Sequence, residues 1–578
     1  MLSYLVRYRR RIVIGFFFTV ATNILALIAP WILKYAIDSL DDVGAKSILI
    51  RYGLIIVAVA LAQGFLRFLM RWVLVGVSRE VENDIRNDML GHLLRLSFSY
   101  FNRTRSGDIM ARATADLNSV KRLLGMGLSN IFNTLTIYAT AMVFMVRIDP
   151  ILTLYSLIPL PFLAVMVNRF SGSVHRRYEE IQEDFSRISE KVQENVSGIR
   201  VVKAYVQEES ELKEFDRLNW EYTLKNLSLA KLESMVDPLL AFIAGVGSLI
   251  VLWTGGMKVI SAEITLGDFV AFNAFLGMLI WPTMALGWVI TLLQRGDTSM
   301  GRIAEILNEV PEIADGDRTL PQEVLGPIEG EIEFKNLSFS YNGRPVLRGI
   351  NLRIEKGMTV AVVGPIGAGK STLISLIPRF FEAEGGELFI DGMDIKSLPL
   401  KFLRKHIGFV HQETFLFSDT LRDNIAYGLT DFSQSEVEEA AAVAQLGGDV
   451  ADFADRFDTM VGERGVTLSG GQKQRTAIAR AVVLKPKILI LDDALSSVDT
   501  HTEEEILKRL RKVMGERTSI IISHRISTVK DADLIVVLDG GSIVERGTHH
   551  ELLDKGGLYA DMFYKQQLQE EMDSEGSR

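Results

Sequence analysis

The sequence contains no cysteine among its 578 residues. This absence excludes disulfide bonds, cysteine-ligated zinc, iron–sulfur clusters and a cysteine nucleophile. Positive charge is also in short supply, because 63 Lys and Arg face 72 Asp and Glu, which gives a formal net charge of −9. A chain with this balance is not expected to have nucleic acid as a partner, although local basic patches remain compatible with it.

The hydropathy of the chain changes along its length. Mean hydropathy is +0.20 although 23% of the residues are charged, a combination that predicts a membrane part joined to a soluble part. Long apolar runs fill the first part, and the segment 308–327 is rich in proline, glycine and acids, which is typical of an exposed linker. We therefore predict a transmembrane domain at 1–320 and a soluble domain at 321–578.

Six apolar stretches in the first part are long enough to cross a bilayer, which takes about 20 mostly apolar residues. Basic loops stay in the cytosol, so loop charge predicts orientation. The N-terminus is basic, and two long segments between the stretches, 76–125 and 171–235, are charged. The helical pattern continues through 76–100 in the first and 171–230 in the second. We expect all three in the cytosol together with the soluble domain, which predicts a multi-pass protein of the cytoplasmic (inner) membrane. The stretches are 12–37, 49–75, 126–147, 150–170, 236–257 and 267–293, and the N-terminal charges are Arg7, Arg9, Arg10 and Arg11.

The strongest local signal in the soluble part is 364-GPIGAGKST-372, which fits the pattern G-x-x-x-x-G-K-[ST]. It follows the apolar run 359–363 and opens the amphipathic segment 372–380, as a phosphate-binding loop between a strand and a helix requires. Lys370 would neutralise phosphate charge and Ser371 would bind Mg²⁺. The expected phosphate-binding residues, called the P-loop below, are Gly364, Pro365, Ile366, Gly367, Ala368, Gly369, Lys370, Ser371 and Thr372.

A second signal is 487-KILILDD-493, an aliphatic run that ends in two carboxylates. Continuous aliphatic residues are typical of a buried parallel strand, and the carboxyl ends of such strands bind ligands in open α/β sheets. Asp492 suits a Mg²⁺ site, and Asp493 is placed to polarise the attacking water.

A third signal is 468-LSGGQKQR-475, which precedes a helical segment. Ser469, Gly470 and Gly471 offer a hydroxyl and backbone N–H groups at a helix N-terminus, which makes a second anion site. One nucleotide does not need two such sites within one chain. The arrangement fits a site that serves a nucleotide held by another subunit.

Taken together, these motifs make the soluble part resemble the nucleotide-binding domain of an ABC transporter, a family whose signature is LSGGQ. With the six preceding stretches, the chain resembles a half-size ABC exporter of the multidrug and lipid exporter type, with a type IV membrane fold. The resemblance implies a six-span α-helical membrane domain with long cytoplasmic extensions, followed by an α/β P-loop ATPase domain with a helical signature subdomain. It also implies ATP and Mg²⁺ as cofactors, a lipid bilayer around the spans, and hydrophobic or amphipathic substrates such as drugs, lipids or peptides.

The resemblance assigns roles to further residues. Tyr341 matches the aromatic residue that stacks on adenine, Gln412 matches the glutamine that touches Mg²⁺ or the attacking water, and His524 matches the histidine that contacts the γ-phosphate. The implied catalytic residues are Asp493, His524 and Gln412, and the implied metal ligands are Ser371, Gln412 and Asp492. Gln472 joins Ser469, Gly470 and Gly471 as an implied nucleotide contact.

Loops are matched in the same way. The segment 496–499 resembles the D-loop, which crosses to the opposite subunit, and 462–465 resembles the X-loop of exporters. The segments 101–116 and 193–209 resemble the two intracellular loops, each with a short coupling helix that docks on a nucleotide-binding domain.

One position departs from the family pattern. Most hydrolysing members carry Glu where this chain has Asp493, whose carboxylate reaches roughly 1 Å less far, and such a misplacement can slow a reaction around 100-fold. We therefore predict a heterodimer in which this chain's own site is degenerate and slow, while its intact signature completes the site of a non-identical partner with Glu at that position. The alternatives are a homodimeric exporter with Asp as catalytic base, or an ATP-gated channel.

Overall fold

A computed structural model describes residues 2–40, 45–462, 465 and 467–576. Packing divides the chain into two units, one made of Met1–Leu94 and Arg105–Glu309, the other of Arg95–Thr104 and Val310–Arg578. The predicted domain boundary at residues 320 and 321 stays a prediction. Units defined by packing can include segments that are distant in sequence, and the second unit includes Arg95–Thr104. The two units are described separately below.

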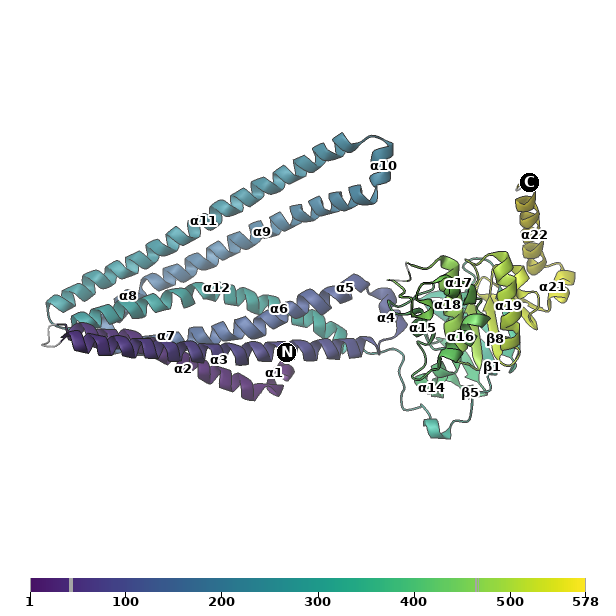
Figure 1. The fold of residues 1–578 in the computed structure, drawn as a ribbon, viewed down its shortest axis with the longest axis horizontal. Helices are drawn as coiled ribbons and strands as arrows, with labels where there is room; N and C mark the ends of the chain where they lie inside the picture. The colour runs from purple at the N-terminus through teal and green to yellow at the C-terminus, as the bar shows by residue number, and fades with distance from the viewer. Residues whose placement is uncertain (1, 41–44, 463–464, 466, 577–578) are drawn as a thin grey trace. The chain divides into compact units, whose positions relative to one another are not determined.

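The first unit is entirely helical in its described residues, and its helices are labelled in Figure 1. Five helices are long and apolar enough to cross a membrane, by length and composition alone: Arg9–Asp38, Lys46–Leu93, Ser106–Ile148, Glu208–Ile260 and Leu266–Asn308. The helical segments of this unit are α1 Leu2–Arg7, α2 Arg9–Asp38, α3 Ala45–Leu93, α5 Ser106–Ala111, the π-helical η1 Arg112–Asp116, α6 Leu117–Arg122, the π-helical η2 Leu123–Gly127, α7 Leu128–Ile148, α8 Pro150–Leu157, α9 Pro159–Ser197, α10 Ile199–Ala204, α11 Glu208–Ile260 and α12 Leu266–Asn308.

The stretch predicted as the fourth span, 150–170, is divided between α8 and α9. Pro159 lacks a backbone N–H and interrupts the helical hydrogen-bond ladder, so α9 starts anew at this residue. The apolar part of the two helices, Pro150–Met166, is shorter than the other five. Six spans therefore remain a prediction, which requires α8 and the start of α9 to cross together.

The predicted helical extensions are confirmed. α3 runs without a break to Leu93, and α9 and α11 form a long hairpin that is closed by α10, as Figure 1 shows. Short six-residue helices overlap both predicted intracellular loops, namely α4 (Phe98–Arg103) and α10.

Buried side chains of α2, α7, α8, α11 and α12 form the apolar core of this unit, with Leu27, Met145, Phe272 and Phe275 among its members. A polar contact crosses the same bundle, because the Asn23 amide donates hydrogen bonds to Thr136 Oγ1 and to the Asn133 carbonyl. Burying an amide is tolerable only when it is bonded in this way.

The second unit contains two sheets. A four-stranded antiparallel sheet has the order β2-β1-β4-β5, and a six-stranded sheet has the order β10-β9-β3-β8-β7-β6. In the larger sheet all neighbouring pairs are parallel except β10 with β9. The strands are β1 Ile332–Tyr341, β2 Arg344–Ile354, β3 Thr359–Val363, β4 Gly385–Ile390, β5 Met393–Asp394, β6 Ile407–Val410, β7 Ile488–Asp492, β8 Thr518–Ile522, β9 Leu534–Asp539 and β10 Ser542–Gly547.

Helices surround these strands. They are α4, α13 Lys370–Ser375, α14 Leu400–Lys405, α15 Leu421–Ile425, α16 Gln434–Val443, α17 Gly447–Asp452, α18 Gly470–Val483, α19 Thr500–Met514, α20 Ile526–Val529, α21 His549–Lys555 and α22 Leu558–Gly576, with 3-10 turns η3 Gln322–Val324, η4 Ile395–Ser397 and η5 Arg456–Asp458.

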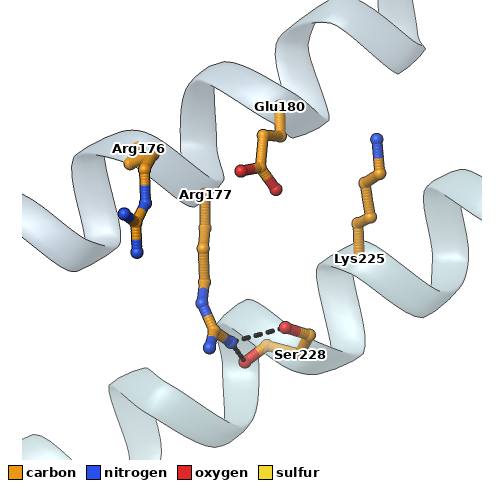
Figure 2. A pocket seen from close by; sticks show the side chains of 5 residues that line it. All are labelled: Arg176, Arg177, Glu180, Lys225 and Ser228. Atoms are coloured by element: carbon orange, nitrogen blue, oxygen red, sulfur yellow. Dashed lines mark hydrogen bonds between the residues drawn. The ribbon is translucent and has the colours of Figure 1, made fainter.

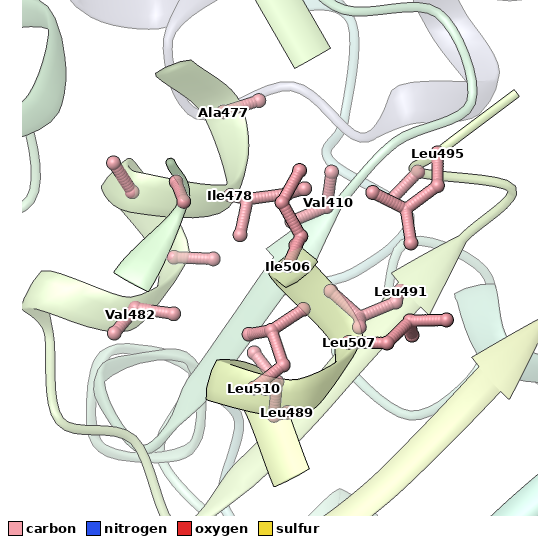
Figure 3. Close-up of a cluster of buried hydrophobic side chains, with 14 of the residues drawn as sticks. Val410, Ala477, Ile478, Val482, Leu489, Leu491, Leu495, Ile506, Leu507 and Leu510 are labelled. Carbon is pink, nitrogen blue, oxygen red and sulfur yellow. The ribbon is translucent and has the colours of Figure 1, made fainter. Parts of the chain in front are cut away.

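Strand β7 shows how the unit is held together. All five of its residues are buried, and successive side chains point to opposite faces of the sheet. Leu489 and Leu491 join the core that contains α18 and α19, while Ile488 and Ile490 join the core on the other face. Figure 3 shows the first of these cores, in which side chains of α18 and α19 gather over β7. The helix that begins at LSGGQ is therefore anchored to the strand that ends in Asp492.

Candidate functional site

Three neighbouring strands end at one edge of the larger sheet. β3 leads into the P-loop, β8 leads to His524, and β7 ends in Asp492 followed by Asp493. β8 lies between the other two and is parallel to both, with Asp492 paired to Ile522. The topology thus brings together residues that are more than 150 positions apart in the sequence, at the strand ends where α/β sheets bind ligands.

The P-loop requires glycine at its two ends. Gly364 has φ +147°, and a Cβ there would lie 2.0 Å from the Leu538 carbonyl oxygen. Gly369, with φ +98°, is the left-handed residue before α13, and a Cβ there would meet Leu347 at 2.9 Å. No other residue fits both the backbone conformation and the space at either position.

Lys370 is the first residue of α13 and is only 7% exposed. Its ammonium donates hydrogen bonds to the carbonyls of Gly364 (2.8 Å) and Pro365 (2.9 Å), so it reaches back over the loop. Burial lowers the pKa of Lys370, and the negative charges of Asp492 and Asp493 oppose that shift. A cation held against the P-loop backbone is positioned to neutralise a phosphate there.

Ser371 and Asp492 are in direct contact. The Ser371 hydroxyl donates a hydrogen bond of 3.1 Å to Asp492 Oδ1. Burial raises the pKa of Asp492, which is 6% exposed, and Asp493 raises it further, whereas Ser371, Lys370 and His524 lower it. A hydroxyl and a carboxylate side by side at a phosphate loop are hard oxygen donors of the kind Mg²⁺ takes together with phosphate oxygens. The residues present therefore fit this metal.

Asp493 adopts a left-handed backbone conformation with φ +46°. Its N–H donates to the Ile522 carbonyl at 2.9 Å, and the residue is half-buried. Asp tolerates this conformation better than most residues because its short side chain can bond locally. The backbone of the predicted base is thus fixed between β7 and β8.

The other three predicted residues lie in different surroundings. Tyr341 is half-buried at the end of β1, and its ring packs edge-on against Phe339 and Phe381, with centroids 4.8 and 5.2 Å away. Gln412 and His524 are exposed, and within the described residues the Gln412 side chain makes no hydrogen bond. Sequence reasoning missed Phe381, which supports the Tyr341 ring from a segment 40 residues away.

The predicted second anion site lies at the start of α18. Ser469 is the N-cap of this helix, its hydroxyl accepts from the Gln472 N–H, and the Gln472 side chain accepts from the Ser469 N–H at 2.9 Å. Gln472 also donates to Asp449 at 2.9 Å. This capping box fixes the loop that carries Gly470 and Gly471, so its free N–H groups point out of a rigid helix end.

A buried glutamine links this helix to the D-loop. Gln474 is 4% exposed, its amide donates to Ser496 Oγ at 2.8 Å, and its carbonyl accepts from the Ser497 N–H at 2.8 Å. Sequence reasoning missed this residue, although a lone glutamine among the apolar positions of α18 was a usable signal. Of the X-loop at 462–465, Glu463 and Arg464 lie outside the described residues.

Comparison with known proteins shows the family to which the chain belongs. Residues 12–283 match the family model of the ABC transporter transmembrane region, and residues 347–496 match the family model described as ABC transporter. Over 574 residues the chain is 38% identical to the probable multidrug resistance ABC transporter ATP-binding/permease protein YheI of Bacillus subtilis (strain 168), which covers 98% of this chain and 96% of that protein. The chain is a half-size ABC exporter.

Other relatives of this exporter agree. The ATP-dependent lipid A-core flippase of Syntrophus aciditrophicus (strain SB) is 35% identical over 526 residues, covering 91% of this chain and 87% of that protein. A solved structure of a bacterial Atm1-family ABC exporter with ATP bound superposes with a TM-score of 0.80 at 28% identity, over 96% of this chain and 99% of that one. The predicted family and fold class are confirmed: a helical membrane domain is followed by an ABC ATPase domain, which couples ATP hydrolysis to transport in a dimer.

Proposed function

We propose that this exporter half pairs with a non-identical partner and that its own ATP site hydrolyses slowly. The observation that carries the proposal is Asp493, at the position where the family pattern described above has Glu in most hydrolysing members. Its backbone is held by the Ile522 carbonyl, so backbone movement does not extend the reach of the shorter side chain. A base that falls roughly 1 Å short loses around 100-fold in rate.

The residues of the site have complementary proposed roles. Tyr341 stacks on adenine, and the P-loop N–H groups with Lys370 hold the phosphates. Ser371, Asp492 and Gln412 hold Mg²⁺, which neutralises phosphate charge when bound. His524 contacts the γ-phosphate. Its position near Asp492, whose pKa it helps to lower, supports that role.

The signature supports the second half of the proposal. Ser469, Gly470, Gly471 and Gln472 form an intact, capped helix start at which no bond to this chain's own P-loop is found in the described residues. They serve the partner's nucleotide instead. The Gln474 bridge to Ser496 and Ser497 supports coupled movement of this signature with the D-loop.

The proposed transport reaction is export of hydrophobic or amphipathic molecules from the cytoplasmic (inner) membrane by alternating access. The N-terminus and the ATPase domain lie in the cytosol, as the basic start of the chain indicates. Relatives whose names specify multidrug resistance and lipid A-core flipping support this substrate class. Closure of two ATPase domains on ATP shifts the membrane helices toward the outward-open state, because ATP binds the closed dimer more tightly.

The test is to purify this chain alone in lipid nanodiscs and to measure its ATPase rate and subunit stoichiometry. We expect slow turnover or failure to dimerise, and recovery when a partner with Glu at the matching position is added. A homodimer that turns over as fast as ordinary exporters contradicts the proposal and favours Asp493 as a working base. Passive flux that follows ATP binding, without uphill transport, favours an ATP-gated channel.

A further inference from the structure

A polar pocket of about 290 Å³ lies between the two long helices of the α9–α11 hairpin. Its lining comes from both helices, as Figure 2 shows: Arg176, Arg177 and Glu180 from α9, and Lys225 and Ser228 from α11. Three of these side chains are cationic and one is anionic, so the lining carries a net charge of +2. In a chain with a net charge of −9, this is a local reversal of sign.

The cations of the pocket differ in how they are already bonded. Lys225 forms an ion pair of 2.7 Å with Asp184, which is 3% exposed and also binds Arg187. Burial would raise the pKa of Asp184, but the hydrogen bonds from Lys225 and Arg187 outweigh it and hold that pKa below its ordinary value. The charge of Lys225 is therefore compensated within the hairpin.

The two arginines are not compensated in this way. Arg177 donates to the carbonyl of Ser228 at 2.8 Å and to its hydroxyl, both of them neutral groups that orient the guanidinium without cancelling its charge. Arg176 has no hydrogen-bond or ion-pair partner among the described residues, and Glu180 likewise has none. Two guanidinium groups and one carboxylate thus remain available around a single pocket.

The position of the pocket along the helices restricts its ligand. Arg176 follows the predicted fourth span (150–170) by six residues, and Ser228 precedes the fifth (236–257) by eight, so the pocket lies roughly 10 Å beyond the apolar segments. The head-group layer extends about 5–7 Å beyond the hydrocarbon core, and an arginine stem can span the remaining distance. The phosphates of the nearest lipid leaflet are therefore within reach.

We propose that this pocket binds the head group of an aminophospholipid from that leaflet. The phosphodiester lies against Arg176 and Arg177, because guanidinium groups bind phosphate oxygens in a planar, two-pronged geometry. The lipid ammonium lies against Glu180 and donates charge-assisted hydrogen bonds to its carboxylate, which a head group without an amine cannot do. The site thus selects a zwitterionic head group with free N–H donors, and this inference is independent of the pairing proposed above.

The test is native mass spectrometry of the full chain with added phosphatidylethanolamine, phosphatidylglycerol or phosphatidylcholine. We expect preferential retention of phosphatidylethanolamine, and a loss of about tenfold or more in its affinity in the double variant Arg176→Gln/Arg177→Gln, since two charge-assisted hydrogen bonds are removed. Glu180→Gln should abolish the preference over phosphatidylglycerol. Lys213→Gln is the matched control, because it removes an exposed charge from α11 away from the pocket.

Two lysine substitutions and two soluble competitors test the geometry of the site and the source of its ligand. Arg176→Lys/Arg177→Lys retains charge but not the planar fork, so it should restore binding only in part. Equal binding by the double glutamine variant, or a wild-type preference for phosphatidylglycerol, would overturn the site. Displacement of the lipid by millimolar inorganic phosphate or glycerophosphoethanolamine would overturn the lipid assignment in favour of a soluble phosphate ligand. Unchanged size-exclusion profiles establish that the variants are folded.

Discussion

The Ser371 hydroxyl donates a 3.1 Å hydrogen bond to Asp492 Oδ1, and this bond joins the first turn of α13 to the last residue of β7. The two residues are 121 positions apart, yet they form one pair of oxygen donors at the P-loop. Each alone is a weak ligand for Mg²⁺. Held together, they are the pair that we propose as Mg²⁺ ligands beside the phosphates.

Removing one member of this pair should weaken the use of Mg²⁺ more than the binding of nucleotide. Ser371→Ala leaves the P-loop backbone and Lys370 in place but deletes one proposed metal ligand. We expect the apparent Mg²⁺ affinity in ATP hydrolysis by the assembled dimer to fall about 10- to 100-fold, while binding of ATP without Mg²⁺ changes little. Ser375→Ala is the control, since its hydroxyl donates to the Ser371 carbonyl on the same helix. Equal Mg²⁺ dependence in both variants would remove Ser371 from the metal site.

A second prediction concerns the bridge from α18 to the D-loop. Gln474→Leu keeps the size of the side chain but leaves the Ser497 N–H and the Ser496 hydroxyl without their partner. Because a buried unsatisfied group costs about 1–3 kcal/mol, we expect a lower thermal midpoint and faster amide exchange at 496–499. Gln434→Ala, an exposed glutamine on α16, should leave both unchanged. Normal exchange at 496–499 in Gln474→Leu would show that other contacts hold the D-loop.

The motifs that could be recognised in the sequence are those in which a short local pattern carries the physics. The aliphatic run before Asp492 predicts a buried strand, and the glycines of the P-loop predict a tight turn before a helix. Both were correct, because each depends on neighbours along the chain. The extensions of α3 and α9 were also predictable, since their periodicity continues past the apolar segments without a breaker.

Contacts between distant segments could not be predicted in this way. Gln474, Phe381 and the Ser371–Asp492 bond depend on which strands become neighbours, and a single sequence does not fix the strand order. The break at Pro159 was missed for a different reason. The span was predicted from its overall hydropathy, which does not register the local loss of one backbone N–H donor. The Arg177–Ser228 contact likewise requires the hairpin register, which charge patterning alone does not give.

A third prediction concerns pH and the C-terminal helices. His549, the first residue of α21, shares a 2.7 Å hydrogen bond with the hydroxyl of the fully buried Tyr559 on α22. Burial lowers the pKa of His549, and the nearby His550 and Lys530 lower it further, against a smaller opposite effect of Asp531. Between the lowered pKa of the folded state and the ordinary histidine pKa of 6.5, the unfolded chain therefore binds more protons than the folded one.

Stability contributed by this contact is present above that pKa and is lost as the pH falls. As the pH falls from about 7.5 to 5.5, we expect the protection factors of the α22 amides, which are exchange rates corrected for the intrinsic pH dependence of exchange, to fall in the wild type. His549→Gln can still bond Tyr559 but does not titrate, so the α22 protection factors should depend less on pH in this variant. His550→Gln, at an exposed neighbouring position, should keep the pH response and move it slightly, because His550 contributes to the lowered pKa of His549 but makes no bond to Tyr559. A pH response that survives in His549→Gln would assign it to another group.

The last prediction measures the reach of Asp493. In a dimer whose partner has its matching Glu replaced by Gln, only this chain's own site can turn over. Asp493→Glu extends the carboxylate by one methylene, and we expect the rate at this site to rise by about 10- to 100-fold. The gain is limited because Glu adopts the left-handed conformation at this position less readily than Asp.

The reverse change separates a slow site from a working one. With an intact partner, Asp493→Asn should alter the overall transport rate little, because in the proposed heterodimer the partner's site, completed by Ser469–Gln472 of this chain, performs most of the hydrolysis. Ser469→Arg is the matched comparison, since it places a bulky cation in the partner's site and should stop transport. If Asp493→Asn abolishes transport as completely as Ser469→Arg does, both sites must hydrolyse ATP in every transport cycle, and the shorter carboxylate is a competent base.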